Sequence, residues 1–158
     1  MSVLVLGIGN LIMTDDGIGV RVVQQLAKHY RIPEGVELLE GGTLGLNLLS
    51  DLKGVERLLV VDALETGQLP GTLQRLEGDE IPLAFETRLS PHELGLKDLL
   101  TVAAMLGDSP QEVVLWGIQP ERLDLGEDLS ASVAARLDDL TDRVADELRR
   151  WGLTMDFR

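Results

Sequence analysis

The distribution of hydrophobic and polar residues along the chain predicts alternating strands and helices. Short, mostly apolar runs, which are typical of buried strands, occupy residues 3–6, 36–39, 58–61 and 113–118, with Glu37 the one charged residue among them. Residues 72–77 alternate imperfectly between apolar and polar side chains, as an edge strand with one solvent-facing side does. We therefore expect five strands.

Helical periodicity appears between these strands and at the end of the chain. Val22, Leu26 and Tyr30 recur every four residues after a polar cluster at 14–17, which predicts a helix. A short helix follows Thr43, a candidate N-cap, and another begins near Ser90. The clearest apolar stripe predicts a final helix that covers one face of the sheet, and it consists of Val133, Leu137, Leu140, Val144, Leu148 and Trp151.

The order of these elements predicts an α/β fold. Alternating strands and helices favour right-handed crossovers and parallel pairing. Only 3% of residues are aromatic, so the core must consist of Leu, Val and Ile, which suits a sheet buried on both faces. We expect residues 1–158 to form a single-domain three-layer sandwich, in which helices flank both faces of a twisted, mostly parallel five-stranded sheet.

Charge and composition exclude several classes of function. The chain has 27 acidic and 14 basic residues, and its net charge of -13 repels nucleic acids and anionic lipids. It has no cysteine, which excludes disulfides, thiolate nucleophiles and cysteine-ligated zinc. We find neither a secretion signal nor a membrane span and expect a cytoplasmic protein. No apolar stripe is left unassigned, so we also expect a monomer.

Acidic side chains and one imidazole follow the predicted strands. Asp15 and Asp16 come after the first strand, Glu40 ends the second, Asp62 ends the third, and His92 precedes a later helix. In open α/β sheets, ligands bind outside the carboxyl ends of the strands, where these residues should meet. Because clustered carboxylates repel one another, a metal ion is the simplest explanation, and nickel, zinc and iron all fit such ligands.

Each candidate also has a purely structural interpretation. Asp15 or Asp16 could cap the first helix, and this interpretation is favoured for Asp15. Glu40 could be an ordinary acid at a strand end, whereas Asp62 adjoins a buried strand, where a carboxylate needs a partner. His29 lies near the end of the first helix and is interpreted as structural. His92 on its own would suit a surface or capping position.

Two other segments have competing interpretations. Residues 119–128 are rich in acids and carry Pro120 and Gly126, which favours an exposed connector, with a part in a binding surface as the alternative. Residues 7–10 begin like a dinucleotide-binding turn, but Ile12 stands where the third glycine is needed. A nucleotide-binding module is therefore the weaker alternative. The chain lacks a Gly-x-Ser-x-Gly elbow, a lysine-bearing phosphate loop and a His-Glu-x-x-His motif.

Seven short segments, taken together and in order, resemble the nickel-iron hydrogenase maturation proteases. They extend over most of the chain and consist of residues 7–10 (Gly-Ile-Gly-Asn), 14–20 (Thr-Asp-Asp-Gly-Ile-Gly-Val), 41–43 (Gly-Gly-Thr), 60–63 (Val-Val-Asp-Ala), 70–72 (Pro-Gly-Thr), 90–95 (Ser-Pro-His-Glu-Leu-Gly) and 117–120 (Gly-Ile-Gln-Pro). Each segment alone is weak. Their shared order, the short chain and the lack of cysteine make the set specific.

This resemblance implies an endopeptidase that removes a carboxyl-terminal extension from the precursor of a [NiFe]-hydrogenase large subunit after nickel insertion. By motif match, the metal-contacting acids of the family fall on Asp16 and Asp62, and its histidine falls on His92. The family also suggests that the substrate presents the nickel, so that these residues sense whether the metal is loaded. Many relatives have glutamate at the position of Asp16, so the carboxylate arm here is shorter by one methylene.

The resemblance leaves the chemical step open. A metal could polarise the scissile carbonyl or lower the pKa of an attacking water, while Asp16 or Asp62 serves as general base and His92 as ligand and orienting group. A noncatalytic nickel-binding assembly factor that uses the same three residues remains the main alternative.

Overall fold

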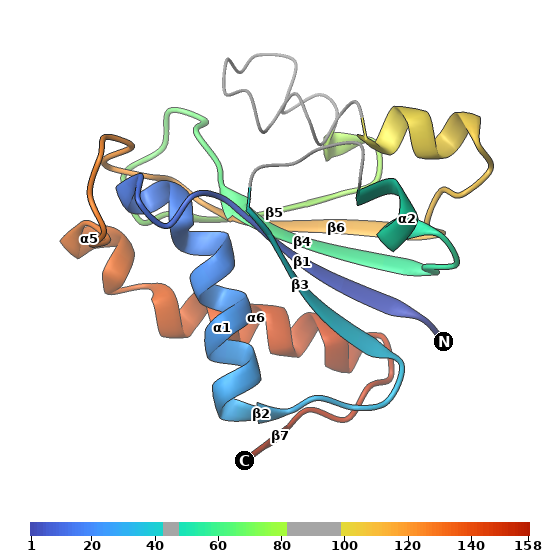
Figure 1. The fold of residues 1–158 in the computed structure, drawn as a ribbon. Coiled ribbons are helices and arrows are strands. Elements are labelled where there is room, and N and C mark those ends of the chain that lie inside the picture. Colours follow the sequence, from blue (N-terminus) through green and yellow to red (C-terminus); the bar gives the residue numbers. More distant parts are fainter. Residues whose placement is uncertain (43–47, 82–98) are drawn as a thin grey trace.

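The computed structural model describes residues 1–42, 48–81 and 99–158, and its centre is a five-stranded sheet (Figure 1). The order of the strands across the sheet is β3-β1-β4-β6-β5. Their bounds are Val3–Ile8 for β1, Val36–Gly42 for β3, Arg57–Ala63 for β4, Leu73–Glu77 for β5 and Glu112–Ile118 for β6. The apolar runs of the sequence thus predicted four of these strands, and the imperfect alternation of residues 72–77 predicted β5.

The sheet is parallel except at one edge. The pairs β1–β3, β1–β4 and β4–β6 are parallel, and only β5 runs antiparallel, against β6. Every residue of β1 is buried, which agrees with its central position. The chain runs from β1 to β3 on one side and then crosses to β4 on the other side of β1. The strand order thus reverses at β1 and β4, and their carboxyl ends mark the point where ligands bind in such sheets.

Helices cover both faces of the sheet, as expected. On one face, α1 (Ile18–His29) and α6 (Leu137–Arg150) pack against the side chains of Val5, Val61 and Trp116. On the other face, α2 (Leu49–Leu52) and the helical residues 99–105 pack against Leu6 and Val60. The predicted α/β fold, with a mostly parallel sheet flanked by helices, is confirmed. The N-cap predicted at Thr43 lies outside the described residues.

The final helix differs from the prediction, because it is split in two. A short helix α5 (Ala131–Ala134) is followed by a break at Arg136, whose backbone (φ −109°, ψ 3°) leaves the helical region. The four-residue step from Val133 to Leu137 is compatible with an unbroken helix, so the apolar pattern could not reveal the break. The stripe itself is confirmed: Val133 and Leu148 are fully buried against the sheet.

A small second sheet joins the end of α1 to the last residues of the chain. The strand β2 (Tyr30–Arg31) pairs antiparallel with β7 (Asp156–Phe157), and the Tyr30 and Phe157 rings stack with their centroids 4.7 Å apart. Tyr30 had been predicted as the last position of a helical face, but α1 ends one residue earlier, at His29. His29 is exposed in the last turn of α1, where a structural interpretation placed it.

Candidate functional site

The turn between β1 and α1 packs closely onto the carboxyl ends of the central strands. It forms the 3-10 helix η1 (Thr14–Gly17), which carries Asp15 and Asp16 and contacts β4. Gly19 follows it so closely over the sheet that a Cβ atom there would overlap the carbonyl oxygens of Val61 and Ile8. The absence of a side chain at this glycine therefore lets the turn with both acids lie on the edge that β1 and β4 form.

Asp62 is the buried acid of this edge. It is the sixth residue of β4 and only 1% exposed. Its Oδ1 accepts a hydrogen bond of 2.8 Å from the backbone N–H of Ala63. Side chains alternate along a strand, so Asp62 shares the sheet face of Leu58 and Val60. A carboxylate buried at a strand end is costly unless it is compensated, which makes this position a strong functional candidate.

Asp16 is the partly exposed acid of the same edge. Its Oδ2 accepts a hydrogen bond of 3.0 Å from the backbone N–H of Asn10, so the carboxylate is turned toward the residues just after β1. Neither η1 nor α1 has a side-chain cap at its start. The capping interpretation of Asp16 is therefore wrong, and its carboxylate remains a candidate for chemistry at the sheet edge.

Asp15 is a fully buried structural acid, but it does not cap a helix as predicted. Its Oδ2 accepts backbone N–H bonds of 2.9 Å from Glu121 and from Arg122. Its Oδ1 accepts the N–H of Ser130 at 2.8 Å, and the Ser130 hydroxyl donates to Oδ2 at 2.8 Å. The side chain thus joins η1 to the loop of residues 119–130, and its buried oxygens are satisfied by donors of that loop.

Thr14 holds a strained backbone just before the two acids. It is the only non-glycine residue with positive φ (48°) in the part of the chain that the structure describes. Its N–H donates to Gly126 O at 2.8 Å, and its hydroxyl contacts the carbonyl oxygens of Arg122 (2.8 Å) and Asp124 (3.1 Å). Such strain concentrates at functional sites, where surrounding contacts enforce it. Thr14 and Asn10 lie within the segments that carry the family resemblance, but the sequence did not indicate their contacts, because their partners depend on tertiary structure.

Glu40 lies beside this edge without joining a metal cluster. It is exposed in β3, and its carboxylate accepts a hydrogen bond of 2.9 Å from Gln24. It also lines a hollow of about 400 Å³ together with Gly9, Asn10, Leu11, Val20 and Gly42. Its interpretation as an ordinary strand-end acid fits these contacts. The hollow, however, opens next to the Asn10 backbone that Asp16 contacts.

His92 lies outside the described residues, so its position relative to Asp16 and Asp62 stays a prediction. The described residues that flank this part of the chain are Ile81 and Leu99, and both pack on the sheet face that Asp62 shares. Among the described residues, no group of three or more acids and histidines is arranged to hold a metal ion. The predicted three-residue metal site therefore depends on His92.

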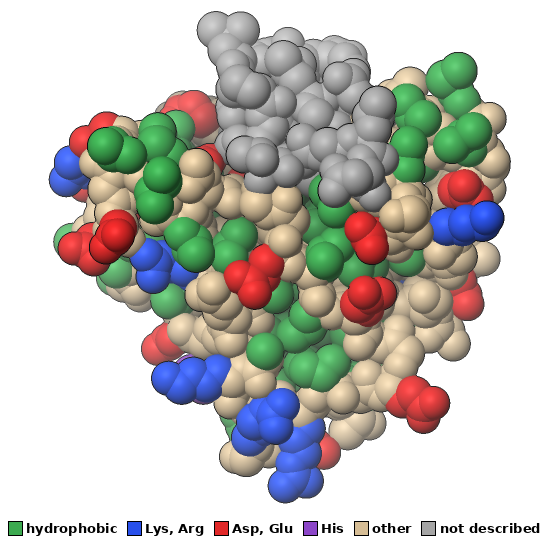
Figure 2. Space-filling model, in the orientation of Figure 1, with side chains coloured by type: hydrophobic (Ala, Val, Ile, Leu, Met, Phe, Trp, Pro, Cys, Tyr) green, Lys and Arg blue, Asp and Glu red, His purple; other side chains and the backbone are tan. Residues whose placement is uncertain are grey.

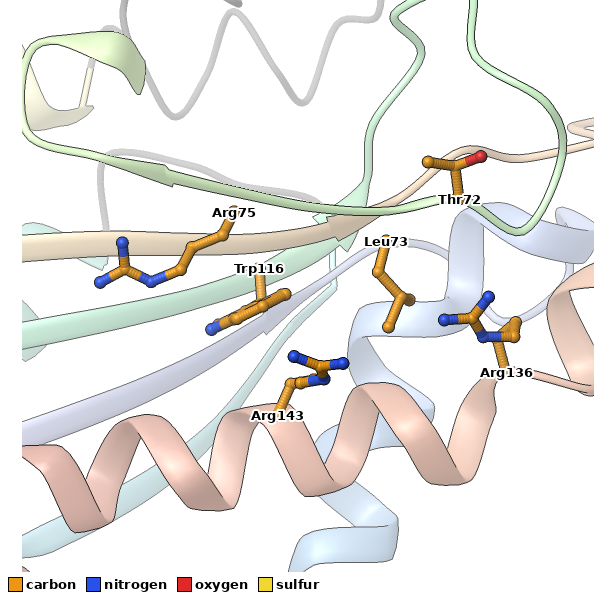
Figure 3. Close-up of a pocket in the computed structure, with 6 residues that line it drawn as sticks. All are labelled: Thr72, Leu73, Arg75, Trp116, Arg136 and Arg143. Carbon is orange, nitrogen blue, oxygen red and sulfur yellow. The ribbon is translucent and has the colours of Figure 1, made fainter.

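A second hollow, of about 470 Å³, lies between the sheet and α6, on the face opposite to that of Asp62. Figure 3 shows the residues that line it: Thr72, Leu73, Arg75, Trp116, Arg136 and Arg143. Arg75 forms a double hydrogen bond with the buried Glu147 (2.6 and 3.1 Å), which also accepts the Trp116 indole N–H at 3.0 Å. Burial alone would raise the pKa of Glu147, but these hydrogen bonds outweigh it and lower that pKa. Three arginines disfavour a cation, so this hollow is no metal site.

None of the described helices is long and apolar enough to cross a membrane.

Comparisons with known proteins agree with this architecture. The family model described as HycI, hydrogenase maturation protease, matches residues 20–147. The chain is 38% identical over 154 residues to the hydrogenase 2 maturation protease of Escherichia coli (strain K12), covering 97% of this chain and 94% of that protein. It is 40% identical over 153 residues to the hydrogenase expression/formation protein HupD of Rhodobacter capsulatus, covering 96% and 73%.

Solved structures give the same result. The hydrogenase maturating endopeptidase HybD from Escherichia coli superposes with a TM-score of 0.96 at 38% identity and covers 100% of this chain and 98% of that one. The [NiFe] hydrogenase maturation protease HybD from Thermococcus kodakarensis gives 0.76 at 32% identity, with coverage of 94% and 99%. Because the family model spans most of the chain and these relatives match it almost from end to end, the chain belongs to the hydrogenase maturation protease family of endopeptidases.

Proposed function

We propose that this chain removes the C-terminal extension of a [NiFe]-hydrogenase large-subunit precursor after nickel insertion, and that Asp16, Asp62 and His92 recognise the inserted nickel. Family membership supports the reaction class. One observation supports the site above all others: the turn that carries Asp16 packs on β4, the strand that ends with the buried Asp62. Two acids 46 positions apart in sequence thereby belong to one sheet edge.

The ligand types suit nickel delivered by the substrate. Two carboxylates and an imidazole are ligands that a borderline divalent ion accepts. Carboxylates at one edge also repel each other, and a divalent cation relieves that repulsion. A precursor without nickel would lack this attraction, so cleavage would follow metal loading. The role of His92 rests on the family resemblance and on the packing of Ile81 and Leu99 on the Asp62 face.

The hydrolytic step needs a base and a polarised carbonyl. In our proposal, Asp62 or Asp16 accepts the proton of a water molecule, whose oxygen then bonds to the carbonyl carbon of the scissile peptide. The bond to the leaving amine breaks as that nitrogen takes up a proton. The nickel of the substrate supplies Lewis acidity, either to the carbonyl or to the attacking water.

A processing assay tests this function. Purified protein is incubated with nickel-loaded and with nickel-free precursor, and the released peptide is identified by mass spectrometry. We expect cleavage of the loaded precursor only. Alanine at Asp16, Asp62 or His92 should lower the rate by about a hundredfold or more, whereas alanine at Glu37, an exposed acid of β3, should leave it unchanged. Wild-type rates in all three site variants would show that the assignment is wrong.

The same assay separates the protease from a noncatalytic nickel-binding assembly factor. Both bind nickel-loaded precursor through the same residues, but only the protease shortens the large subunit. Retention of a full-length precursor in a stable complex would favour the assembly factor.

We also propose that the protein acts as a cytoplasmic monomer, because the apolar stripes of its described helices are buried within the fold. Sedimentation analysis of the purified protein and fractionation of the producing cells test the two parts of this statement.

A further inference from the structure

Three large apolar side chains stand exposed on the segments beside Asp16. Ile12 is 51% exposed, Leu123 is 43% exposed and Leu125 is 73% exposed. We call these three residues the apolar platform. Figure 2 shows hydrophobic side chains gathered over η1 and the neighbouring loop of residues 119–130, with acidic and basic side chains beside them. Single exposed apolar residues are common on protein surfaces, but a group of them marks a surface that contacts a partner.

Backbone hydrogen bonds hold the platform together, although Ile12 lies more than 100 positions from Leu123 and Leu125 in sequence. The N–H of Gly126 donates to Ile12 O at 2.8 Å, and the residues Met13 and Gly126 form a parallel bridge. The buried carboxylate of Asp15 accepts hydrogen bonds from the backbone N–H groups of Glu121, Arg122 and Ser130 in the loop. Four hydrogen bonds to one buried carboxylate fix this loop, so its exposed leucines do not belong to a loosely held connector.

The platform is continuous with the proposed cleavage site. Ile12 lies between Asn10, whose N–H contacts the Asp16 carboxylate, and Thr14, the strained first residue of η1. Ile12 is thus four positions from Asp16, and the hydrogen bonds that residues 12 and 14 make with the loop place the platform next to the turn that carries Asp16.

The rim of the platform is negatively charged. The loop exposes Glu121, Asp124, Glu127 and Asp128. Its one basic residue, Arg122, is engaged by Asp124 at 2.7 Å. A complementary surface would present apolar side chains flanked by lysine or arginine. Three side chains are also too small an area for a stable dimer, which needs about 800 Å² on each partner, whereas a brief enzyme–substrate contact needs less.

From these observations we propose that Ile12, Leu123 and Leu125 form a docking surface for the folded body of the precursor, which meets it with an apolar patch bordered by basic residues. This inference rests on the proposed function and assigns it a substrate-recognition surface outside the three metal-sensing residues. The segment of residues 119–128 is then part of a binding surface, the alternative that the sequence left open.

Steady-state cleavage of nickel-loaded precursor tests the apolar part of this surface. The double variant Ile12→Ser/Leu125→Ser should raise KM about tenfold or more and leave kcat within about twofold. The matched control is Met105→Ser/Leu106→Ser, which removes two side chains that are 81% and 62% exposed on another surface. The control should keep the wild-type KM. Circular dichroism and thermal unfolding verify that both variants fold.

The charged rim is tested separately. The variant Glu127→Lys/Asp128→Lys should also raise KM. Added salt should raise the KM of the wild type more than that of this variant, because salt screens the attraction between the acidic rim and a basic partner. An unchanged KM in both the apolar and the charge variants overturns the docking surface, as does an equal rise of KM in the control.

Measurement of equilibrium binding tests the docking surface without relying on cleavage. Immobilised wild-type protein and the variants are compared for binding of purified precursor. If the wild type binds but does not cleave, the proposed function fails, while weaker binding by Ile12→Ser/Leu125→Ser still supports the docking surface. If the wild type sediments as a dimer and this double variant as a monomer, a second copy is the occupant and the inference is wrong.

Discussion

Glu147 and Asp15 are both buried carboxylates, yet their partners differ in kind. Glu147, which is 2% exposed, meets the guanidinium of Arg75 and the indole of Trp116. Asp15, which is 0% exposed, meets three backbone N–H groups and the hydroxyl of Ser130. The first carboxylate joins α6 to the sheet, and the second joins a loop to the turn that carries Asp16. Their variants should therefore affect different properties, stability for Glu147 and substrate processing for Asp15.

Removal of the Glu147 carboxylate should have the largest effect on stability. In Glu147→Ala, Arg75 and the Trp116 N–H lose their shared acceptor beneath β5 and β6, and we expect a loss of about 3 kcal/mol of unfolding free energy. Urea unfolding measures it. Cleavage well below the melting temperature should stay within about twofold of wild type. The control Asp146→Ala breaks an exposed pair with Arg149 and should change stability by less than about 1 kcal/mol.

The variant Asp15→Asn should lose less stability than Glu147→Ala but more cleavage activity. An amide cannot accept all the bonds that the carboxylate accepts, and its NH₂ would face a donor, so we expect a loss of about 2 kcal/mol. The rate of precursor cleavage should fall about tenfold or more, because the loop and η1 no longer hold each other in place. Equal processing by Asp15→Asn and wild type would mean that this carboxylate serves stability alone, as Glu147 does.

Asp16 provides an internal comparison with its neighbour Asp15. If it acts on the substrate, Asp16→Glu should retain kcat/KM within about tenfold, which corresponds to about 1.4 kcal/mol, because glutamate supplies the same group on a longer arm. Asp16→Asn should lose far more activity while unfolding like the wild type. A large loss of stability in Asp16→Asn would instead give this residue a structural role.

The smallest effect is expected in the pH dependence of stability. The folded-state pKa of Glu147 lies below its ordinary value of 4.5, so its contribution is fully present above pH 4.5 and is lost as pH falls through the lower, folded value. The stability difference between wild type and Glu147→Gln should therefore shrink on acidification below pH 4.5. Urea unfolding at several pH values measures it, and a difference that grows in acid would contradict the assigned shift.

The sequence predicted the features that repeat locally. Apolar runs identified four strands, imperfect alternation identified the partly exposed edge strand β5, and the stripe from Val133 to Trp151 identified the helical cover of the sheet. It could not reveal the break at Arg136, since the spacing of apolar residues continues through it. Motif resemblance, rather than periodicity, indicated the protease family, which the comparisons confirm.

The candidate site was only partly predictable for a different reason. The strand-end rule gathered Asp15, Asp16, Glu40 and Asp62, because parallel strands end at one edge of a sheet. The family resemblance then selected Asp16 and Asp62 among them. The partners of Asp15 lie 106 to 115 positions along the chain, and no local pattern connects a carboxylate to such distant N–H groups. The left-handed backbone of Thr14 is equally hidden, because those tertiary contacts enforce it.

The antiparallel pairing of β2 with β7 has a practical consequence for experiments. Helix α1 runs from the Asp16 edge to the opposite end of the sheet, and there the pairing of Tyr30 with Phe157 fixes the last residues of the chain (Figure 1). A dye, affinity handle or surface tether attached after Arg158 would leave the protein at that far end. Immobilised in this way, the protein would present its carboxylate edge to an incoming precursor without obstruction.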